Sequence, residues 1–288
     1  MQFHVNGELV PESEASIPVD DRGFQYGDAA FETLRAYNGT LFEWEAHRAR
    51  LEHSCAGLGM DDVLPADLHD RIVETLEAND LAEAYVRASI TRGIQPGTLT
   101  PQPEVEPSVI IVVKELPKGG PDGESRWDAP ATVETVEVRK PDPEAIPPDL
   151  KTHNYLNGLL ARLELREPDG SVRADEALLL DSDGFVAEGT TSNVFFVEDG
   201  VLHTTSLDGP ILAGVTRSVV IELAEENDIP VETGRYPPER LREADELFLT
   251  NTTGEVWPVA RLDDSEIGGG PITERLADRF DERVGELY

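Results

Sequence analysis

The residues with the clearest chemical potential lie in the stretch Asp149-Leu150-Lys151-Thr152-His153-Asn154-Tyr155-Leu156. The sequence holds twenty arginines but only four lysines, so each lysine needs a reason. Lys114, Lys118 and Lys140 lie beside proline, glycine or another charge, and we interpret them as solvated. Lys151 instead is predicted to open an amphipathic helix, because apolar residues follow it at roughly helical spacing: Tyr155, Leu159, Leu160 and Leu163.

An amine at Lys151 could do what a guanidinium cannot. Arginine stays protonated, whereas a desolvated lysine can lose its proton and form an imine with a carbonyl compound. The alternative is a lysine at a helix start with its charged end in water. Lys151 is therefore a candidate for covalent catalysis.

Two further stretches could bind a phosphate group without a glycine-rich P-loop. Gly214-Val215-Thr216-Arg217 places glycine before a predicted helix, whose first N–H groups favour an anion. Asn251-Thr252-Thr253-Gly254 ends a strand with hydroxyls and a turn that could face the same anion. Arg50 could complete the site. Alternatively, Thr216 caps its helix, Thr252 and Thr253 form an ordinary turn, and Arg50 lies on the surface.

Glu188 stands between Ala187 and Gly189 at the end of an apolar strand. A buried carboxylate there needs a cation or hydrogen-bond donors as partners. A protonated pyridine nitrogen would be such a partner, and an arginine would be another.

Two predicted strands carry polar residues on one face. In 30–37, Phe31, Thr33 and Arg35 share a face by period two, and in 84–92 Tyr85 and Arg87 do so together with Ser89. Thr and Arg are unusual on a buried face, so this face is predicted to line a polar cavity.

The surrounding elements indicate an α+β fold. Asn6-Gly7 predicts a hairpin turn, helices are expected over 45–58, 65–79, 214–227 and from about 272, and short strands lie between them without steady βαβ alternation. Proline, glycine and charge dominate 118–128, which is the predicted linker between an N-terminal domain 1–117 and a larger domain 129–288.

Composition restricts the classes of function. The formal net charge of −34 is spread along the 288 residues, which indicates an acidic coat suited to a salt-rich, halophilic cytoplasm and disfavours nucleic acid as a partner. No 18-residue apolar run or signal-peptide pattern is present, so we expect a cytoplasmic protein without a membrane segment. Cys55 is the single cysteine, and no metal-ligand cluster is apparent.

The ordered motifs resemble the class IV (fold-type IV) pyridoxal-phosphate aminotransferases, a family that includes branched-chain and D-amino-acid aminotransferases and aminodeoxychorismate lyases. The resemblance runs from Val5 to Val259. It rests on Asp21-Arg22-Gly23, Tyr26-Gly27-Asp28, Phe31-Glu32, Lys151 with Asn154-Tyr155, Glu188-Gly189 with Ser192-Asn193-Val194-Phe195, Gly214-Val215-Thr216-Arg217, Asp245-Glu246-Leu247-Phe248 and Thr252-Thr253-Gly254-Glu255 with Pro258-Val259.

The resemblance implies a small N-terminal domain and a larger C-terminal domain, with pyridoxal 5′-phosphate at their interface. It makes Lys151 the residue that forms the internal aldimine and also moves the substrate proton. Tyr155 would contact the phenolic oxygen of the cofactor and Glu188 its ring nitrogen, while the phosphate would be held by Arg50, Gly214, Val215, Thr216 and Thr252. The implied substrate pocket comprises Tyr26, Phe31, Thr33, Arg35, Tyr85, Arg87, Thr253 and Gly254.

The subfamily signals point in different directions. Tyr85-Val86-Arg87 resembles the branched-chain enzymes, whereas Ile90-Thr91-Arg92-Gly93 resembles the D-amino-acid and lyase branches. Thr33 stands where branched-chain enzymes commonly have glycine and where lyases carry a threonine. Gln95-Pro96-Gly97-Thr98 lacks the Arg-x-His pattern of the D-amino-acid branch. The Lys151-to-Tyr155 spacing is also one residue shorter than the usual branched-chain pattern.

The main hypothesis is a transaminase that exchanges an amino group between a branched or otherwise apolar L-amino acid and 2-oxoglutarate. The alternatives are an aminodeoxychorismate lyase, a D-amino-acid or (R)-amine transaminase, or a cofactor-binding protein without turnover. The resemblance also implies a homodimer with shared active sites.

Overall fold

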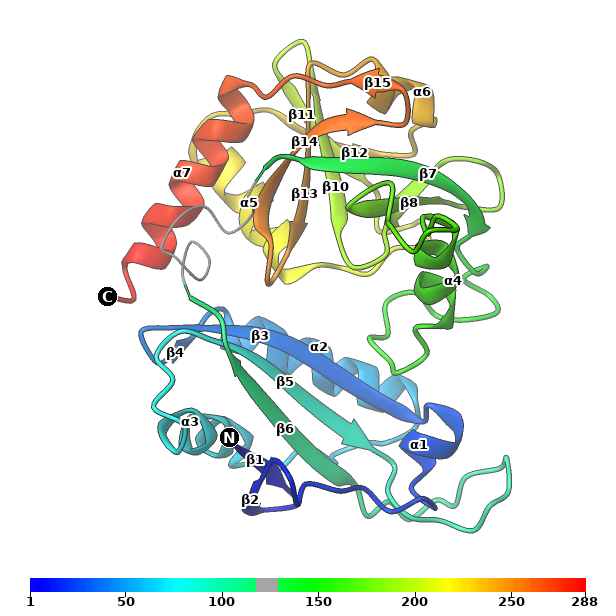
Figure 1. The fold of residues 1–288 in the computed structure, drawn as a ribbon, viewed down its shortest axis with the longest axis vertical. Helices are drawn as coiled ribbons and strands as arrows, with labels where there is room; N and C mark the ends of the chain where they lie inside the picture. The colour runs from blue at the N-terminus through cyan, green and yellow to red at the C-terminus, as the bar shows by residue number, and fades with distance from the viewer. Residues whose placement is uncertain (118–128) are drawn as a thin grey trace. The chain divides into compact units, whose positions relative to one another are not determined.

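The computed structural model describes residues 1–117 and 129–288, which form two compact units (Figure 1). The described part of the first unit is 1–117 with Leu150–Asn154 and Leu287–Tyr288; that of the second is 129–149 with Tyr155–Glu286. The predicted linker 118–128 lies outside the described residues. The predicted domain boundaries remain a prediction, and the short segment that carries Lys151 groups with the N-terminal residues.

The first unit is built on an antiparallel sheet with the order β2-β1-β6-β5-β3-β4. Its strands are β1 (Gln2–Val5), β2 (Glu8–Pro11), β3 (Ala29–Tyr37), β4 (Thr40–Leu41), β5 (Ala84–Thr91) and β6 (Ser108–Glu115). Its helices are α1 (Arg22–Tyr26), α2 (Trp44–Gly57) and α3 (Leu68–Glu77). The Asn-Gly hairpin prediction is confirmed, because Asn6 and Gly7 both adopt positive φ (51° and 96°) between β1 and β2.

The two faces of this sheet differ in chemistry. One face of β3 and β5 supplies Leu34, Val86 and Ile90 to an apolar core that includes Leu51 of α2 and Ile72 of α3. Phe31, Thr33 and Arg35 of β3 lie opposite Ser89, Arg87 and Tyr85 of β5, so these six residues share the other face. The sequence-predicted substrate residues of both strands are thus brought onto one surface.

The second unit contains a mixed sheet with the order β12-β11-β10-β13-β14-β7-β8-β9, to which β15 adds through β14. Its strands are β7 (Ala131–Arg139), β8 (Glu176–Leu180), β9 (Val186–Gly189), β10 (Asn193–Glu198), β11 (Val201–Thr205), β12 (Val231–Gly234), β13 (Glu246–Asn251), β14 (Glu255–Leu262) and β15 (Ser265–Glu266). Its helices are α4 (Leu156–Glu164), α5 (Val215–Glu226), α6 (Pro238–Arg242) and α7 (Pro271–Gly285). The α+β class predicted from the sequence is confirmed.

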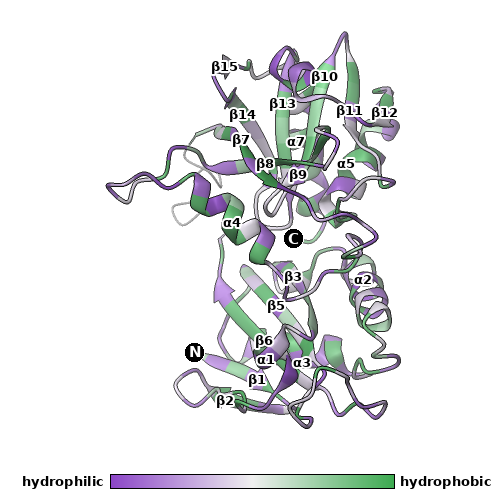
Figure 2. Ribbon diagram, turned by 90° about the vertical axis from the view of Figure 1, so that its right-hand side faces the viewer, coloured by the Kyte–Doolittle hydropathy of each residue, from purple (hydrophilic) through white to green (hydrophobic). Residues whose placement is uncertain are grey.

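Apolar side chains predominate on the middle strands of this second sheet. Figure 2 shows β10 and β13 coloured largely as hydrophobic, and Phe195 and Phe248 stack there with ring centroids 5.0 Å apart. Helices α5 and α7 contact each other and β13, while α4 contacts β7 and β8. Across residues 1–117 and 129–288, no helix is long and apolar enough to cross a membrane.

The prediction that Lys151 opens a helix is wrong. Helix α4 begins five residues later, at Leu156, and its apolar side chains lie largely outward instead of forming a buried stripe: Leu156, Leu159, Leu160 and Leu163 are all exposed. The backbone around Lys151 does not join the helix, because its hydrogen-bonding groups are bound to residues of β3 and α2 in the first unit.

Candidate functional site

The segment of Lys151 is held as a short extension beside the start of β3. Phe31 N–H donates to the Lys151 carbonyl at 3.0 Å, and His153 N–H donates to the Ala29 carbonyl at 3.0 Å. Thr152 forms an isolated antiparallel bridge with Ala30. Because the residues at and after Lys151 are tied to β3, the position of its backbone is set by the sheet and not by a helix.

Helix α2 holds the same backbone from a second direction. Its Ser54 is completely buried, and the Ser54 hydroxyl accepts the Lys151 N–H at 2.9 Å. Near the end of α2, a Cβ on Gly57 would come within 2.5 Å of the Leu150 side chain, so a larger residue there would force that side chain to move. Sequence reasoning missed Ser54, since one serine inside a helix gives no signal of a partner 97 residues away.

The Lys151 amine lies near an aromatic ring that other polar groups also approach. Its Nζ is 4.7 Å from the centroid of the Phe31 ring, and the Arg87 guanidinium lies over the same ring at 3.6 Å. His153 meets that ring edge-on at 5.6 Å and lies 3.3 Å from the Ser89 hydroxyl. Burial, followed by the charge of Arg87, lowers the pKa of His153 to about 4, so this imidazole is neutral at pH 7.

No role was predicted for His153. Its position two residues after Lys151 places it on the same side of an extended segment, so period-two spacing could have identified it once the segment was known not to be helical.

Arg50 is held by a buried carboxylate. Its Nε and Nη2 donate to the two oxygens of Glu32 at 2.7 and 2.8 Å, and His47 Nδ1 lies 2.8 Å from Glu32 Oε2. Burial alone would raise the pKa of Glu32, but the hydrogen bonds from Arg50 and His47 outweigh it and lower the pKa to about 2. Arg50 is therefore a fixed cation and not a mobile surface residue.

Arg35 and Tyr26 lie in different surroundings from the Phe31 cluster. Arg35 is completely buried and donates from Nη2 to the carbonyls of Leu116 and Pro117 at 3.3 and 2.7 Å, so part of its donor capacity fixes the two residues that follow β6. Tyr26 ends α1 and is 39% exposed, with the Arg22 guanidinium 4.8 Å from its ring.

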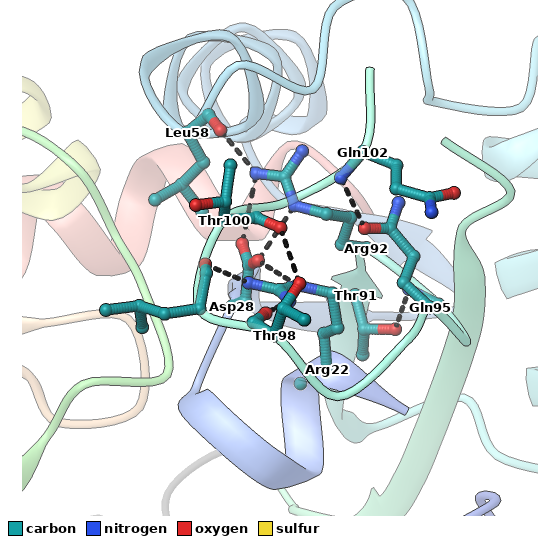
Figure 3. Close-up of polar contacts among 12 residues, drawn as sticks. Arg22, Asp28, Leu58, Thr91, Arg92, Gln95, Thr98, Thr100 and Gln102 are labelled. Atoms are coloured by element: carbon teal, nitrogen blue, oxygen red, sulfur yellow. Dashed lines mark hydrogen bonds and ion pairs between the residues drawn. The ribbon is translucent and has the colours of Figure 1, made fainter. Parts of the chain in front are cut away.

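A second ionic cluster supports the loop that follows β5. Asp28 accepts hydrogen bonds from the side chains of Arg22 and Arg92, as Figure 3 shows. Arg22 also donates to the Thr98 carbonyl at 2.6 Å, and Gln95 Oε1 accepts the Gln102 N–H at 2.9 Å. The motif around residues 21–28 therefore stabilises this loop, and that contact accounts for Arg22 without a catalytic role.

In the second unit, Glu188 lies on β9 with 8% of its surface exposed and has partners on both oxygens. Lys140 Nζ lies 2.7 Å from Oε1, while the Leu212 N–H donates to Oε2 at 2.9 Å and the Asn193 amide at 3.3 Å. The interpretation of Lys140 as solvated is wrong, because 19% of its side chain is exposed and its charge is paired. The pairing of β7, β8 and β9 creates this contact, and local sequence around Lys140 carries no sign of it.

Asn193 connects Glu188 to the start of α5. Its amide also donates to the Leu212 carbonyl at 2.9 Å, and a Cβ on Gly214 would lie 2.0 Å from its Oδ1. Gly214 precedes α5, and no side chain caps the helix. The alternative that Thr216 is only a helix cap is therefore not supported, and the first N–H groups of α5 lack partners within the helix.

The second predicted phosphate stretch forms the turn between β13 and β14. The Oδ1 of Asn251 accepts the N–H groups of Thr253 and Gly254 at 3.0 and 2.5 Å, so those two groups stabilise the turn. Asn251 also donates to the Ser192 hydroxyl at 3.0 Å. Since Asn193 pairs with Thr250 across β10 and β13, the Thr252 turn and the Glu188–Asn193 cluster lie at the same end of the sheet.

Tyr155 occupies the position before α4, and its carbonyl accepts the Leu159 N–H at 2.9 Å.

The first unit brings together Lys151, Phe31 and Arg87, with Arg50 beside Glu32. The second unit brings together Glu188, Asn193 and the start of α5. The first cluster offers an amine and fixed cations, and the second offers a buried carboxylate beside an uncapped helix N-terminus.

Comparison with known proteins gives a consistent family. The family described as "Amino-transferase class IV" matches residues 29–262. A putative branched-chain-amino-acid aminotransferase of Methanocaldococcus jannaschii is 38% identical over 97% of this chain and 95% of its own. A D-alanine aminotransferase of Staphylococcus haemolyticus is 32% identical over 97% and 96% of the two chains.

Solved structures agree with the sequence comparison. The branched-chain aminotransferase from Thermoproteus uzoniensis with norvaline superposes with a TM-score of 0.89 at 29% identity, covering 100% of this chain and 95% of the other. The branched-chain amino acid aminotransferase from Thermobaculum terrenum in its PLP form gives 0.87 at 28% identity, covering 100% of this chain and 94% of the other. The fold expected from the motif resemblance is confirmed.

Proposed function

The chain belongs to the class IV aminotransferases, and we propose that it is a pyridoxal-phosphate transaminase acting on branched or otherwise apolar L-amino acids with 2-oxoglutarate as acceptor. Enzymes of this class use pyridoxal phosphate, and one solved relative is described with pyridoxamine 5′-phosphate. The observation that carries the proposal is the fixation of Lys151: its backbone is bound by β3 and by buried Ser54, next to the Phe31 ring.

The residues fit the cofactor chemically. Glu188 is a buried carboxylate that suits a ring N–H, and α5 starts without a side-chain cap, which suits a phosphate. When bound, pyridoxal phosphate supplies an aldehyde that receives the amino group and a ring that accepts an electron pair. We assign the phosphate to Gly214, Val215, Thr216, Thr252 and Arg50, and the phenolic oxygen to Tyr155.

Lys151 would provide the amine that links to the aldehyde and then moves a proton to and from the substrate. Glu188 would hold the proton on the ring nitrogen. His153, neutral at pH 7, adds no positive charge beside Lys151, whereas Arg87 does. A desolvated amine next to fixed positive charge loses its proton more readily.

For the substrate carboxylate, Arg87 is the better candidate of the two arginines on the polar face. The guanidinium of Arg35 is bound to two backbone carbonyls, while Arg87 lies over Phe31 on the surface shared with Thr33 and Ser89. Tyr26, Tyr85, Thr253 and Gly254 complete the proposed pocket. We also propose a homodimer working in a salt-rich cytoplasm, on the basis of the family and of the charge of −34.

A D-amino-acid transaminase is the second candidate, because the D-alanine aminotransferases are 32% identical along the whole chain. Single-turnover visible spectra of the holoenzyme in high salt separate the candidates. Conversion of the bound aldehyde form to the amine form by L-leucine and L-glutamate supports the main proposal. Conversion by D-alanine or (R)-1-phenylethylamine alone contradicts it in favour of another transaminase branch.

The same experiment tests the remaining alternatives. If no donor converts the cofactor, release of pyruvate and 4-aminobenzoate from aminodeoxychorismate would establish a lyase. A purified protein without visible absorption would contradict the cofactor assignment.

A further inference from the structure

The ion pair between Lys140 and Glu188 is a feature that the proposed function does not require. Lys140 follows the last residue of β7, and its N–H donates to the Leu180 carbonyl at the end of β8 at 2.9 Å. Leu179 of β8 pairs with Glu188 of β9, so the lysine reaches the carboxylate across one strand. Its Nζ lies 2.7 Å from Oε1, with 19% and 10% of the two side chains exposed.

The two oxygens of Glu188 have different kinds of partner. Oε2 is fixed by the neutral donors of Leu212 and Asn193, which are themselves joined by the Asn193–Leu212 hydrogen bond. Oε1 is bound by the cation of Lys140. Since the neutral donors already orient the carboxylate, the distinct contribution of Lys140 is its positive charge.

Other charged side chains on the strands around Glu188 have partners of their own. Glu176 of β8 binds Thr190 and lies 3.6 Å from Arg162, and Glu198 of β10 pairs with Arg240. His203 of β11 contacts Tyr236 and Glu232, and Asp181, which follows β8, pairs with Arg235. Within the described residues, Lys140 is the cation that pairs with Glu188.

We propose that Lys140 is a positioning residue that partly neutralises Glu188 and thereby sets how strongly this carboxylate retains a proton on the ring nitrogen of the cofactor. The inference rests on the proposed function, because it assigns the ring nitrogen to Glu188. A carboxylate shared with Lys140 attracts the ring proton less than an unshared one would. Removing Lys140 should therefore stabilise the cationic forms of the bound cofactor.

The test is a pH titration of the visible absorption of the holoenzyme in high salt. Lys140→Met should move the midpoint of the absorption change to higher pH, by about one pH unit. Lys140→Arg, which keeps the charge, should restore the midpoint of the unchanged protein. Should Lys140→Met fail to fold, Lys140→Gln removes the charge while keeping a hydrogen-bond donor and should give the same shift.

Two comparisons show whether the effect acts through Glu188. Lys114→Met makes the same substitution at an exposed position of β6 and should leave the midpoint unchanged. In a Glu188→Gln background, Lys140→Met should have no further effect. An unchanged midpoint in folded Lys140→Met, an equal shift in Lys114→Met, or a full shift in the Glu188→Gln background would each overturn the inference.

The inference and the proposed function fail in different ways. Absence of a visible chromophore in the unaltered protein would overturn both. A normal chromophore whose pH-titration midpoint is the same with and without Lys140 would overturn only the role of Lys140.

Discussion

Ser54 connects the interior of α2 to the backbone of the candidate catalytic lysine. Ser54→Ala removes the acceptor of the Lys151 N–H and leaves that group without its partner, which should cost about 1–2 kcal/mol of unfolding free energy. Because the same bond sets the position of Lys151, turnover should fall more than stability alone explains. Urea unfolding and single-turnover rates in high salt measure the two effects, with Ser13→Ala at an exposed turn position as control. Equal effects of both variants would contradict this role.

His153 should make the first unit sensitive to acid. Its pKa is about 4 in the folded protein and 6.5 for an ordinary histidine, with burial as the main cause and Arg87 as the second. Between these values the unfolded chain binds more protons, so unfolding becomes easier as the pH falls from 6.5 towards 4. His153→Gln should flatten the dependence of unfolding free energy on pH in this interval.

The exposed His69 supplies the control for that measurement. Its substitution by Gln should leave the slope between pH 4 and 6.5 as it is in the unaltered protein. Part of the slope should remain in His153→Gln, because burial also lowers the pKa values of His4, His47 and His203. A slope equal to that of the unaltered protein would contradict the contribution of His153.

The close contact between Asn193, at the start of β10, and Gly214, just before α5, depends on the lack of a side chain at Gly214. Gly214→Ala would place a Cβ 2.0 Å from Asn193 Oδ1 and displace the side chain that joins Glu188 to Leu212. We expect a loss of about 1–3 kcal/mol of stability and faster loss of cofactor. Gly285→Ala, where nothing lies within 4 Å of the new Cβ, is the matched control in the same unit. Equal retention of the cofactor by the two variants during gel filtration would contradict the prediction.

Local patterns predicted the elements whose causes are local. Asn6-Gly7 predicted the first hairpin, and the helices predicted over 45–58 and 214–227 agree with α2 and α5 to within one residue at each end. The apolar spacing after Lys151 gave a wrong prediction, because Ala29, Phe31 and Ser54 bind the backbone that would have begun the helix. A local sequence pattern does not show hydrogen bonds to residues that are distant in the chain. Here those tertiary hydrogen bonds, and not the local spacing, set the backbone conformation at Lys151.

The functional-site residues show the same difference between features with local causes and features that depend on distant residues. Glu188 was predicted as a buried carboxylate from its apolar neighbours, and it is buried. Its cation was not predicted, since Lys140 reaches it only through the pairing of three strands. Chemical roles assigned from motifs, including those of Tyr155, Thr216 and Thr252, remain predictions.

At the scale of the whole molecule, the charge of −34 should make stability depend on salt. With 58 acidic and 24 basic side chains, self-repulsion opposes the compact state unless ions screen it. Lowering KCl from about 2 M to about 0.1 M should reduce the thermal midpoint and the activity together, because the Debye length grows from below about 3 Å to about 10 Å. An uncharged osmolyte at equal osmolality should not replace the salt. Full activity in dilute buffer would contradict a halophilic protein.

Reduction of the holoenzyme with borohydride, followed by peptide mass spectrometry, would show whether Lys151 carries the cofactor. Reduction fixes the cofactor on whichever lysine holds it, and only four lysines exist in the sequence. We predict the mass increase on the peptide that contains Lys151, and its loss in Lys151→Ala together with the visible colour. A mass increase on Lys140 or another lysine, or none on any lysine, would show that Lys151 does not carry the cofactor.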